Sequence, residues 1–231
     1  MKKATALTTL ALLSALTINA QDGKSVRFGL KVAPNMGWFS SDEKTFSSDG
    51  STVGFNFGLM GDFMIGANQN YAFSTGLMYM TKLGGKYTTT IEAANAGVTS
   101  KVVSKSTLSM QYVQIPLTMK LKTNEIGYMT YYGQIGGDLG INVGAHSDDE
   151  VSTTTNGATT TVTTSNNDVS SFTNTLRVGL IVGAGVEYNF SGNTSAMLGL
   201  TYGNGFTNAF SSKSDASAKL HYFELSLGVF F

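Results

Sequence analysis

The sequence predicts an all-β protein, an eight-stranded antiparallel up-and-down transmembrane β-barrel. Two observations lead to this prediction. Eight segments alternate apolar and polar residues, and the connections between them alternate between long and short. Alternation with a period of two is typical of strands with one apolar face. Long and short connections in turn are typical of barrels that span an outer membrane.

Four segments in the first half of the chain place their apolar residues on one face of a strand. These residues are Phe28, Leu30, Val32, Met36 and Trp38 in 26–39; Phe55, Phe57, Leu59, Phe63 and Ile65 in 53–65; Tyr71, Phe73, Leu77, Tyr79 and Leu83 in 71–83; and Val113, Ile115, Leu117, Met119 and Leu121 in 112–121. Because successive side chains of a strand point to opposite faces, we expect each segment to form a strand with one apolar face.

The second half of the chain repeats this pattern in four more segments. The residues on the apolar face are Met129, Tyr131, Ile135, Leu139 and Ile141 in 128–143; Leu176, Val178, Leu180, Val182, Val186, Tyr188 and Phe190 in 176–190; Ala196, Leu198, Leu200 and Tyr202 in 195–203; and Phe223, Leu225, Leu227, Val229 and Phe231 in 221–231. We expect the aromatic residues near strand ends to form girdles at the membrane interfaces. They are Trp38, Phe39, Phe55, Tyr71, Tyr112, Tyr128, Tyr188, Phe190 and Phe231.

The connections predict which end of the barrel is which. Long loops are expected at 40–52, 84–106, 143–172 and 204–219, and short turns at 66–70, 122–127 and 191–195. With eight strands, both chain ends lie on the side of the short turns. The third long connection contains a tract rich in Ser, Thr and Asn, residues 151–168. Its β-propensity could extend a hairpin, but it has no apolar face to bury, so we expect a mobile surface loop rather than a specific receptor site.

The opposite face of the strands is small, polar or charged, and we expect it to line the barrel interior. Periodicity alone does not fix which face points inward. The charges favour this assignment, because five cations against four anions come close to the balance that buried charges require. The predicted interior polar network consists of Arg27, Lys31, Asp62, Lys82, Lys120, Asp138, Arg177, Glu187 and Glu224.

The first residues of the chain predict export. Lys2 and Lys3 precede an apolar run of about 15 residues, too short for the roughly 20 that a membrane-spanning helix needs. We expect a signal peptide at 1–20, cleaved after Ala20, and a barrel domain at 21–231. Ile18 departs from the usual small residue, so cleavage can fall a residue or two away.

Composition argues against several other functions. Charged residues make up 13% of the chain, about half of the roughly 25% that is usual in globular proteins. The chain has no cysteine and two histidines, and its acidic run 147–150 lacks the spacing of a calcium loop. We expect no cofactor, no metal site, no catalytic residue and no nucleic-acid partner.

Several segments resemble a known family. "YVQIPLTMKL", "GLIVGAGVEYNF", "LTYGNGFTNAF" and the terminal "LSLGVFF" are similar to the outer-membrane β-barrel (porin-family) domain of Gram-negative bacteria. The resemblance covers 21–231 and implies location in the outer membrane. It also implies that the assembly machinery recognises the last strand through Phe223, Leu225, Leu227, Val229 and Phe231. One departure is Thr201, where the family often carries an arginine.

These observations together predict a small, non-enzymatic outer-membrane protein. We expect a mostly plugged polar lumen, because eight strands leave room for little more than side chains. The expected role is structural, surface-interacting or accessory to the envelope, with membrane lipid and the barrel-assembly machinery as partners and any surface or envelope protein partner unidentified. Three alternatives remain: a narrow porin for small solutes, a lipid-modifying enzyme using His221 with Ser211 or Ser212, and a soluble lipocalin-like carrier.

Overall fold

The computed structural model describes residues 26–66, 69–95, 98–191, 194–214 and 216–231. The predicted signal peptide, 1–20, lies outside these residues. The strands are β1 (Val26–Ser40), β2 (Phe46–Ile65), β3 (Tyr71–Asn95), β4 (Val98–Lys122), β5 (Met129–Thr155), β6 (Ala158–Asp168), β7 (Leu176–Ser191), β8 (Thr194–Asn208) and β9 (Lys219–Phe230), and a short 3-10 helix, η1 (Ser170–Phe172), follows β6. In the part of the chain that the structure describes, no helix is long and apolar enough to cross a membrane.

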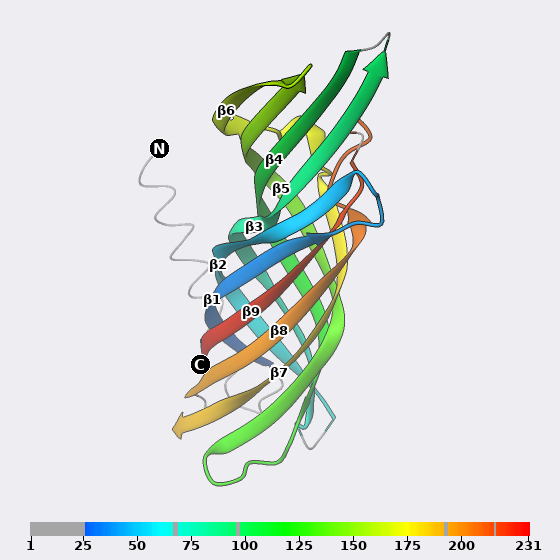
Figure 1. Cartoon of the computed structure of the whole chain (residues 1–231). Helices are drawn as coiled ribbons and strands as arrows, with labels where there is room; N and C mark the ends of the chain where they lie inside the picture. Colours follow the sequence, from blue (N-terminus) through cyan, green and yellow to red (C-terminus); the bar gives the residue numbers. More distant parts are fainter. Residues whose placement is uncertain (1–25, 67–68, 96–97, 192–193, 215) are drawn as a thin grey trace, which may run out of the picture.

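Eight strands close into an antiparallel up-and-down barrel, as the sequence predicts (Figure 1). The ring runs β1, β2, β3, β4, β5, β7, β8 and β9, and β9 returns to β1. Gly29 lies opposite Phe230 and Ser40 opposite Lys219 at this closing seam. The last strand therefore has a partner on each side, which removes the exposed edge that a terminal strand would otherwise present.

The apolar face of the strands points outward. Leu30, Leu77 and Leu200 are each more than half exposed, at 55%, 53% and 56%. A soluble barrel would enclose this face instead. The structure thus settles what periodicity left open and is incompatible with the lipocalin-like alternative.

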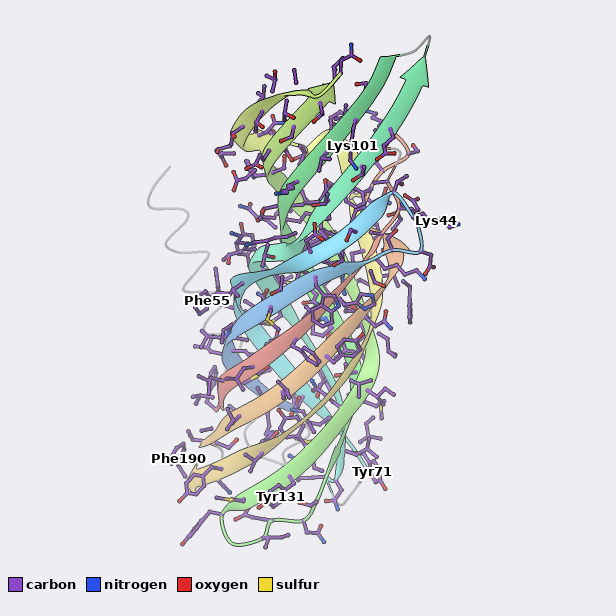
Figure 2. All side chains as sticks on the ribbon, viewed as in Figure 1. Lys44, Phe55, Tyr71, Lys101, Tyr131 and Phe190 are labelled. Atoms are coloured by element: carbon purple, nitrogen blue, oxygen red, sulfur yellow. The ribbon has the colours of Figure 1, made fainter. Side chains whose placement is uncertain are left out.

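Most of the predicted girdle aromatics lie on the outer surface. Figure 2 shows two of them, Tyr71 and Phe190, near the lower end of the barrel, with Phe55 higher up. Two predictions were wrong: Phe39 and Tyr112 point into the barrel and are 1% and 2% exposed. Both residues belong to a part of the interior that is itself apolar. An aromatic side chain at this height can therefore be buried inside the barrel as well as face lipid outside it.

Strands β2 to β6 continue beyond the ring as an open sheet, at the top of Figure 1. We call this the outer sheet; it comprises residues 46–51 of β2, 86–95 of β3, 98–107 of β4, 146–155 of β5 and all of β6. The prediction of long loops was therefore wrong for most of these residues. Asn156 and Gly157 explain the hairpin in the Ser/Thr-rich tract, because both have positive φ, 49° and 84°, as a two-residue hairpin turn requires.

Candidate functional site

The lumen holds three charged clusters, and the largest lies at the end of the barrel with the short turns. This lower charged group consists of Arg27, Asp62, Lys120, Lys122 and Glu187. Arg27 Nη2 lies 2.9 Å from both Asp62 Oδ2 and Glu187 Oε2. Lys120 Nζ lies 2.8 Å from Asp62 Oδ2 and 3.3 Å from Glu187 Oε1, and Lys122 Nζ lies 3.5 Å from Glu187 Oε2. Each acid thus bridges at least two cations.

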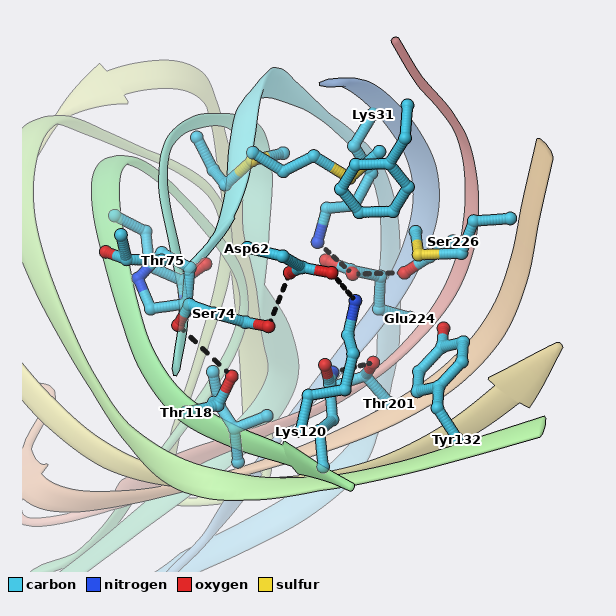
Figure 3. A pocket seen from close by; sticks show the side chains of 18 of the residues that line it. Lys31, Asp62, Ser74, Thr75, Thr118, Lys120, Tyr132, Thr201, Glu224 and Ser226 are labelled. Carbon is cyan, nitrogen blue, oxygen red and sulfur yellow. Dashed lines mark hydrogen bonds and ion pairs between the residues drawn. The ribbon is translucent and has the colours of Figure 1, made fainter. Parts of the chain in front are cut away.

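Neutral side chains add a hydrogen bond and cation–π contacts to this group. The Ser74 hydroxyl donates to Asp62 Oδ1 at 2.5 Å, as Figure 3 shows beside the contact from Lys120. The ring of Phe230 lies beneath the Arg27 guanidinium, 4.3 Å from centroid to Cζ, and 4.9 Å from Lys120 Nζ. A cation over an aromatic face is stabilised by the ring quadrupole. The cations are therefore held from two directions, which fixes their positions across the lumen.

A second cluster centres on Glu224 of β9. Lys31 Nζ lies 2.7 Å from Glu224 Oε1, and the Ser226 hydroxyl donates to the same oxygen at 2.7 Å. The Asn56 amide donates to Glu224 Oε2 and accepts a bond of 2.6 Å from the Asn35 amide. Glu224 is 3% exposed, and it accepts hydrogen bonds from side chains of β1, β2 and β9.

A third cluster lies around Asp138. Arg177 forms an ion pair with Asp138, and the Gln114 amide donates to Asp138 Oδ2 at 2.5 Å and to the Tyr222 hydroxyl at 3.0 Å. The Tyr222 ring leaves no space beside Gly203, because a Cβ on that glycine would overlap the ring. Glycine at 203 is thus what admits a buried tyrosine at this level.

The structure places eight of the nine predicted interior residues in the lumen and puts Lys82 on the outer surface. A bulge between Met80 and Leu83 inserts one extra residue in β3 relative to β4 and reverses the alternation. On the other side of β3, the Thr81 hydroxyl donates to the Phe55 carbonyl of β2 at 3.0 Å. Sequence reasoning missed Lys122, which takes the fifth cationic place. Its spacing of two from Lys120 was an available signal.

A large apolar layer above the charged clusters was also missed. Its buried residues are Phe39, Phe46, Met80, Leu83, Leu108, Met110, Tyr112, Ala145, Ala209, Phe210, Ala218, Leu220 and Tyr222. At its top, four aromatic rings pack together. The ring centroids of Phe46 and Tyr87 are 4.7 Å apart in a stacked arrangement, and the centroid of Phe210 lies 5.7 Å from that of Phe39 and 5.6 Å from that of Tyr87. We call these four residues the aromatic cap.

The segment between β8 and β9 holds Phe210 in the aromatic cap. The Asn174 side-chain amide donates to the carbonyls of Asn208 and Phe210 at 2.8 and 2.9 Å, and the Ser211 N–H donates to the Phe172 carbonyl at 2.9 Å. The segment is thus fixed to η1 and the start of β7. Little space remains below, because the cavity lined by Asp62 and Lys120 has a volume of about 60 Å³, enough for a few water molecules.

His221 lies on the outer surface in an aromatic setting. Its Nδ1 lies 3.1 Å from the Tyr202 hydroxyl, and its ring stacks on Trp38 at 5.9 Å. Ser211, one of the serines considered with it, donates its hydroxyl to the Ser171 carbonyl instead. Thr201, at the position of the family arginine, accepts a bond of 3.4 Å from the Gln134 amide. Within the described residues, no group of three or more metal-ligating side chains comes together.

The outer sheet carries charges of a different kind. Lys101 and Glu92 form an ion pair at 2.8 Å between neighbouring strands, with side chains 50% and 63% exposed. The hydrogen bond from Lys101, together with its positive charge, lowers the pKa of Glu92. A backbone hydrogen bond from Ser170 likewise lowers the pKa of Asp168 at the end of β6. Both acids are therefore charged at neutral pH, at the far end of the molecule from the lower charged group.

The chain can now be compared with known proteins. It is similar in structure to the Neisserial surface protein A (16% identity, TM-score 0.41, covering 88% of this chain and 95% of that one) and to the attachment invasion locus protein Ail of Yersinia pestis (14%, 0.33, 90% and 99%). It is also similar to the outer membrane protein OprG from Pseudomonas aeruginosa (13%, 0.36, 89% and 94%). No curated protein matches the sequence. The family model of the outer membrane protein beta-barrel domain matches residues 19–211, most of the chain, and the protein therefore belongs to this family of outer-membrane barrels.

Proposed function

We propose that the protein is a closed, non-enzymatic outer-membrane barrel that holds its outer sheet at the cell surface for interaction with other molecules. The observation that carries this proposal is the filling of the lumen at two levels. Charged side chains cross it below, and an apolar layer with the aromatic cap fills it above. We further propose that residues 1–20 direct export and that Phe223, Leu225, Leu227, Val229 and Phe231 of the last strand direct assembly.

Each level opposes the passage of ions for its own reason. In the lower charged group, a passing ion would have to displace Arg27 or Lys120 from its acids, and separating a buried pair costs several kcal/mol, about 3–5. In the apolar layer, an ion would lose its water without gaining a polar partner. A solute that overcame one barrier would still meet the other.

The outer sheet supports the surface-interaction part of the proposal. It extends strands β3, β4 and β5 well past the point where β1 and β9 end, so a large share of the chain is invested outside the ring. Lys44 and Lys101, labelled in Figure 2, lie in this upper region, away from the apolar band. A barrel that served only to seal or stabilise the membrane would need no such extension.

Conductance in a planar lipid bilayer tests the closed lumen. We expect no discrete conductance steps from the purified wild-type protein. The lower level is opened by Arg27→Ala with Glu187→Ala, which removes one cation and one anion, and the upper level by Phe39→Ala with Phe210→Ala. Each pair alone should leave the barrel nearly silent, and all four substitutions together should produce steps of small-ion conductance.

A charge-matched control is Lys82→Ala with Asp49→Ala, because both side chains are exposed outside the lumen. Folding of every variant is checked by gel mobility before and after boiling, since a closed barrel resists SDS until heated. Steady conductance steps from the wild type would overturn the proposal and favour the narrow porin. A silent but folded quadruple variant would show that these two levels are not what closes the lumen.

A further inference from the structure

The outer sheet ends in a strand whose far edge is unpaired. Among the described residues, β6 is the last strand in the order of the sheet and pairs with β5 alone. Every side chain along β6 is exposed, and Val162 is 60% exposed. Along the free edge, every second residue directs its N–H and C=O away from β5, which makes the strand a template for another strand.

The other edge of the outer sheet is protected, and the contrast is informative. Residues 46–51 of β2 lie beyond the last β1 pair, Gly37 with Thr52, so their outer edge also lacks a strand. That edge carries Asp49 and a bulge between Ser48 and Gly50. A charge and a bulge are two ordinary means of preventing edge pairing. Residues 158–164 of β6 contain neither a charged residue nor a proline, and the irregularity between β5 and β6 begins only after Thr164.

The sequence of the β6 edge matches itself when reversed. Around Val162, Thr161 mirrors Thr163, Thr160 mirrors Thr164, and Thr159 mirrors Ser165. In an antiparallel pair with a twofold axis at Val162, the two valines would thus face each other and each threonine would face another residue with a hydroxyl group. Thr–Thr and Thr–Ser pairs across strands form hydrogen bonds, as Ser152 with Thr161 at 2.9 Å already does between β5 and β6.

We propose that the partner of the β6 edge is a second copy of this chain, joined through an antiparallel β6–β6 pair centred on Val162. The inference rests on the surface role proposed above and names its partner. It is independent of the lumen, so the conductance test and the test below fail separately. Because the pairing uses the same edge on both copies, it is closed by its twofold symmetry and stops at two.

The strength of this contact follows from its size. A pair of strands of about seven residues buries much less than the roughly 1,200 Å² of a stable interface. The pairing is therefore weak in dilute solution and depends on the high local concentration of a protein confined to a membrane surface. A covalent trap is the appropriate measurement, because it accumulates a weak complex in a defined register.

The absence of cysteine from the chain makes such a trap specific. In Val162→Cys, the twofold pair brings the two Cys side chains together with about 4.5–5.5 Å between Cα atoms, within the range of a disulfide. Mild oxidation of the purified, detergent-solubilised protein should then give a disulfide-linked dimer on a non-reducing gel. The dimer should lose its link on reduction and keep the heat-dependent mobility of a folded barrel.

Thr160→Cys is the matched control. It lies on the same face of the same exposed strand, but the proposed register separates the two copies of residue 160 by four residues, about 14 Å. It should remain monomeric under the same oxidation. Mixed with Thr164→Cys, which lies opposite residue 160, it should form a mixed dimer.

Two results would overturn the proposal. One is a Val162→Cys protein that forms no more dimer than Thr160→Cys, which would mean that the edges do not pair or that collisions alone link them. The other is a mixture of Thr160→Cys and Thr164→Cys that stays monomeric, which would rule out this register. Adding Thr161→Lys to Val162→Cys should abolish the dimer, because the substitution places like charges beside the axis.

Discussion

The lumen and the outer sheet each contain a lysine–carboxylate pair at 2.8 Å, Lys120 with Asp62 and Lys101 with Glu92. The side chains of the first pair are 3% and 2% exposed, and those of the second are 50% and 63% exposed. The two pairs have the same distance between nitrogen and oxygen but differ in their exposure to solvent. Water and salt screen the exposed pair, whereas either member of the buried pair is costly to leave alone. The contribution of an ion pair to stability therefore depends more on its burial than on the distance between its charged atoms.

Removing the buried acid is the strongest test of this comparison. Asp62→Ala leaves Arg27 and Lys120 with only Glu187 between them, so we expect a loss of about 3–5 kcal/mol in the free energy of unfolding. Urea unfolding of the protein in lipid vesicles measures it. Asp49→Ala, on the exposed part of the same strand, should change stability by less than about 0.5 kcal/mol. Equal effects of the two substitutions would contradict the weight given to burial.

An intermediate effect is expected where the lumen is filled by an uncharged side chain. In Gly203→Ala the new methyl group overlaps the Tyr222 ring, and overpacking of this kind costs about 1–3 kcal/mol. Gly133→Ala is the matched control, because the nearest atom to its Cβ would be 4.0 Å away. The same urea experiment compares them. If Gly203→Ala unfolded like Gly133→Ala, the tyrosine would have to be far more mobile than its burial indicates.

The smallest effect is expected for the exposed pair, and it is best detected as a change in the pKa of Glu92. Lys101 lowers the pKa of Glu92 from its ordinary value of 4.5, so the pair contributes to stability above that value and ceases to contribute as pH falls through the lowered pKa. Carbon NMR of the Glu92 carboxyl should show this lowered pKa. Lys101→Gln should return it towards 4.5 without measurably changing urea unfolding. A Glu92 pKa that did not respond to Lys101→Gln would mean that the pair does not form in solution.

The strand pattern could be predicted well from the sequence, because a membrane barrel must show lipid a continuous apolar face. Arg27, Asp62 and Glu187 could be assigned to the interior for the same reason. Lys82 could not, since the bulge before Leu83 depends on how β3 pairs with β4, and pairing is not visible within one segment. Lys122 was missed only because the predicted strand was ended one residue too early.

The apolar layer escaped prediction for a different reason. Where the interior becomes apolar, both faces of a strand carry apolar residues, and a period of two no longer separates them. Phe39 and Tyr112 illustrate the ambiguity, since each was assigned to the outer surface and lies inside. The outer sheet was taken for loops because its strands have no apolar face. The β-propensity of residues 151–168 and the Asn156-Gly157 turn were the local signals that a hairpin was present.

The charges that line the lumen are unevenly divided along the chain. Strands β1 to β4 contribute four cations, Arg27, Lys31, Lys120 and Lys122, against Asp62 alone; strands β5 to β9 contribute Asp138, Glu187 and Glu224 against Arg177 alone. The lumen-facing charges of β1 to β4 are thus net positive and those of β5 to β9 net negative, and the two sets nearly cancel only when the barrel is complete. A partly inserted barrel would expose unpaired charges to lipid. Partly inserted states are therefore unfavourable until the ring closes. Strand insertion and charge neutralisation then become a single cooperative event.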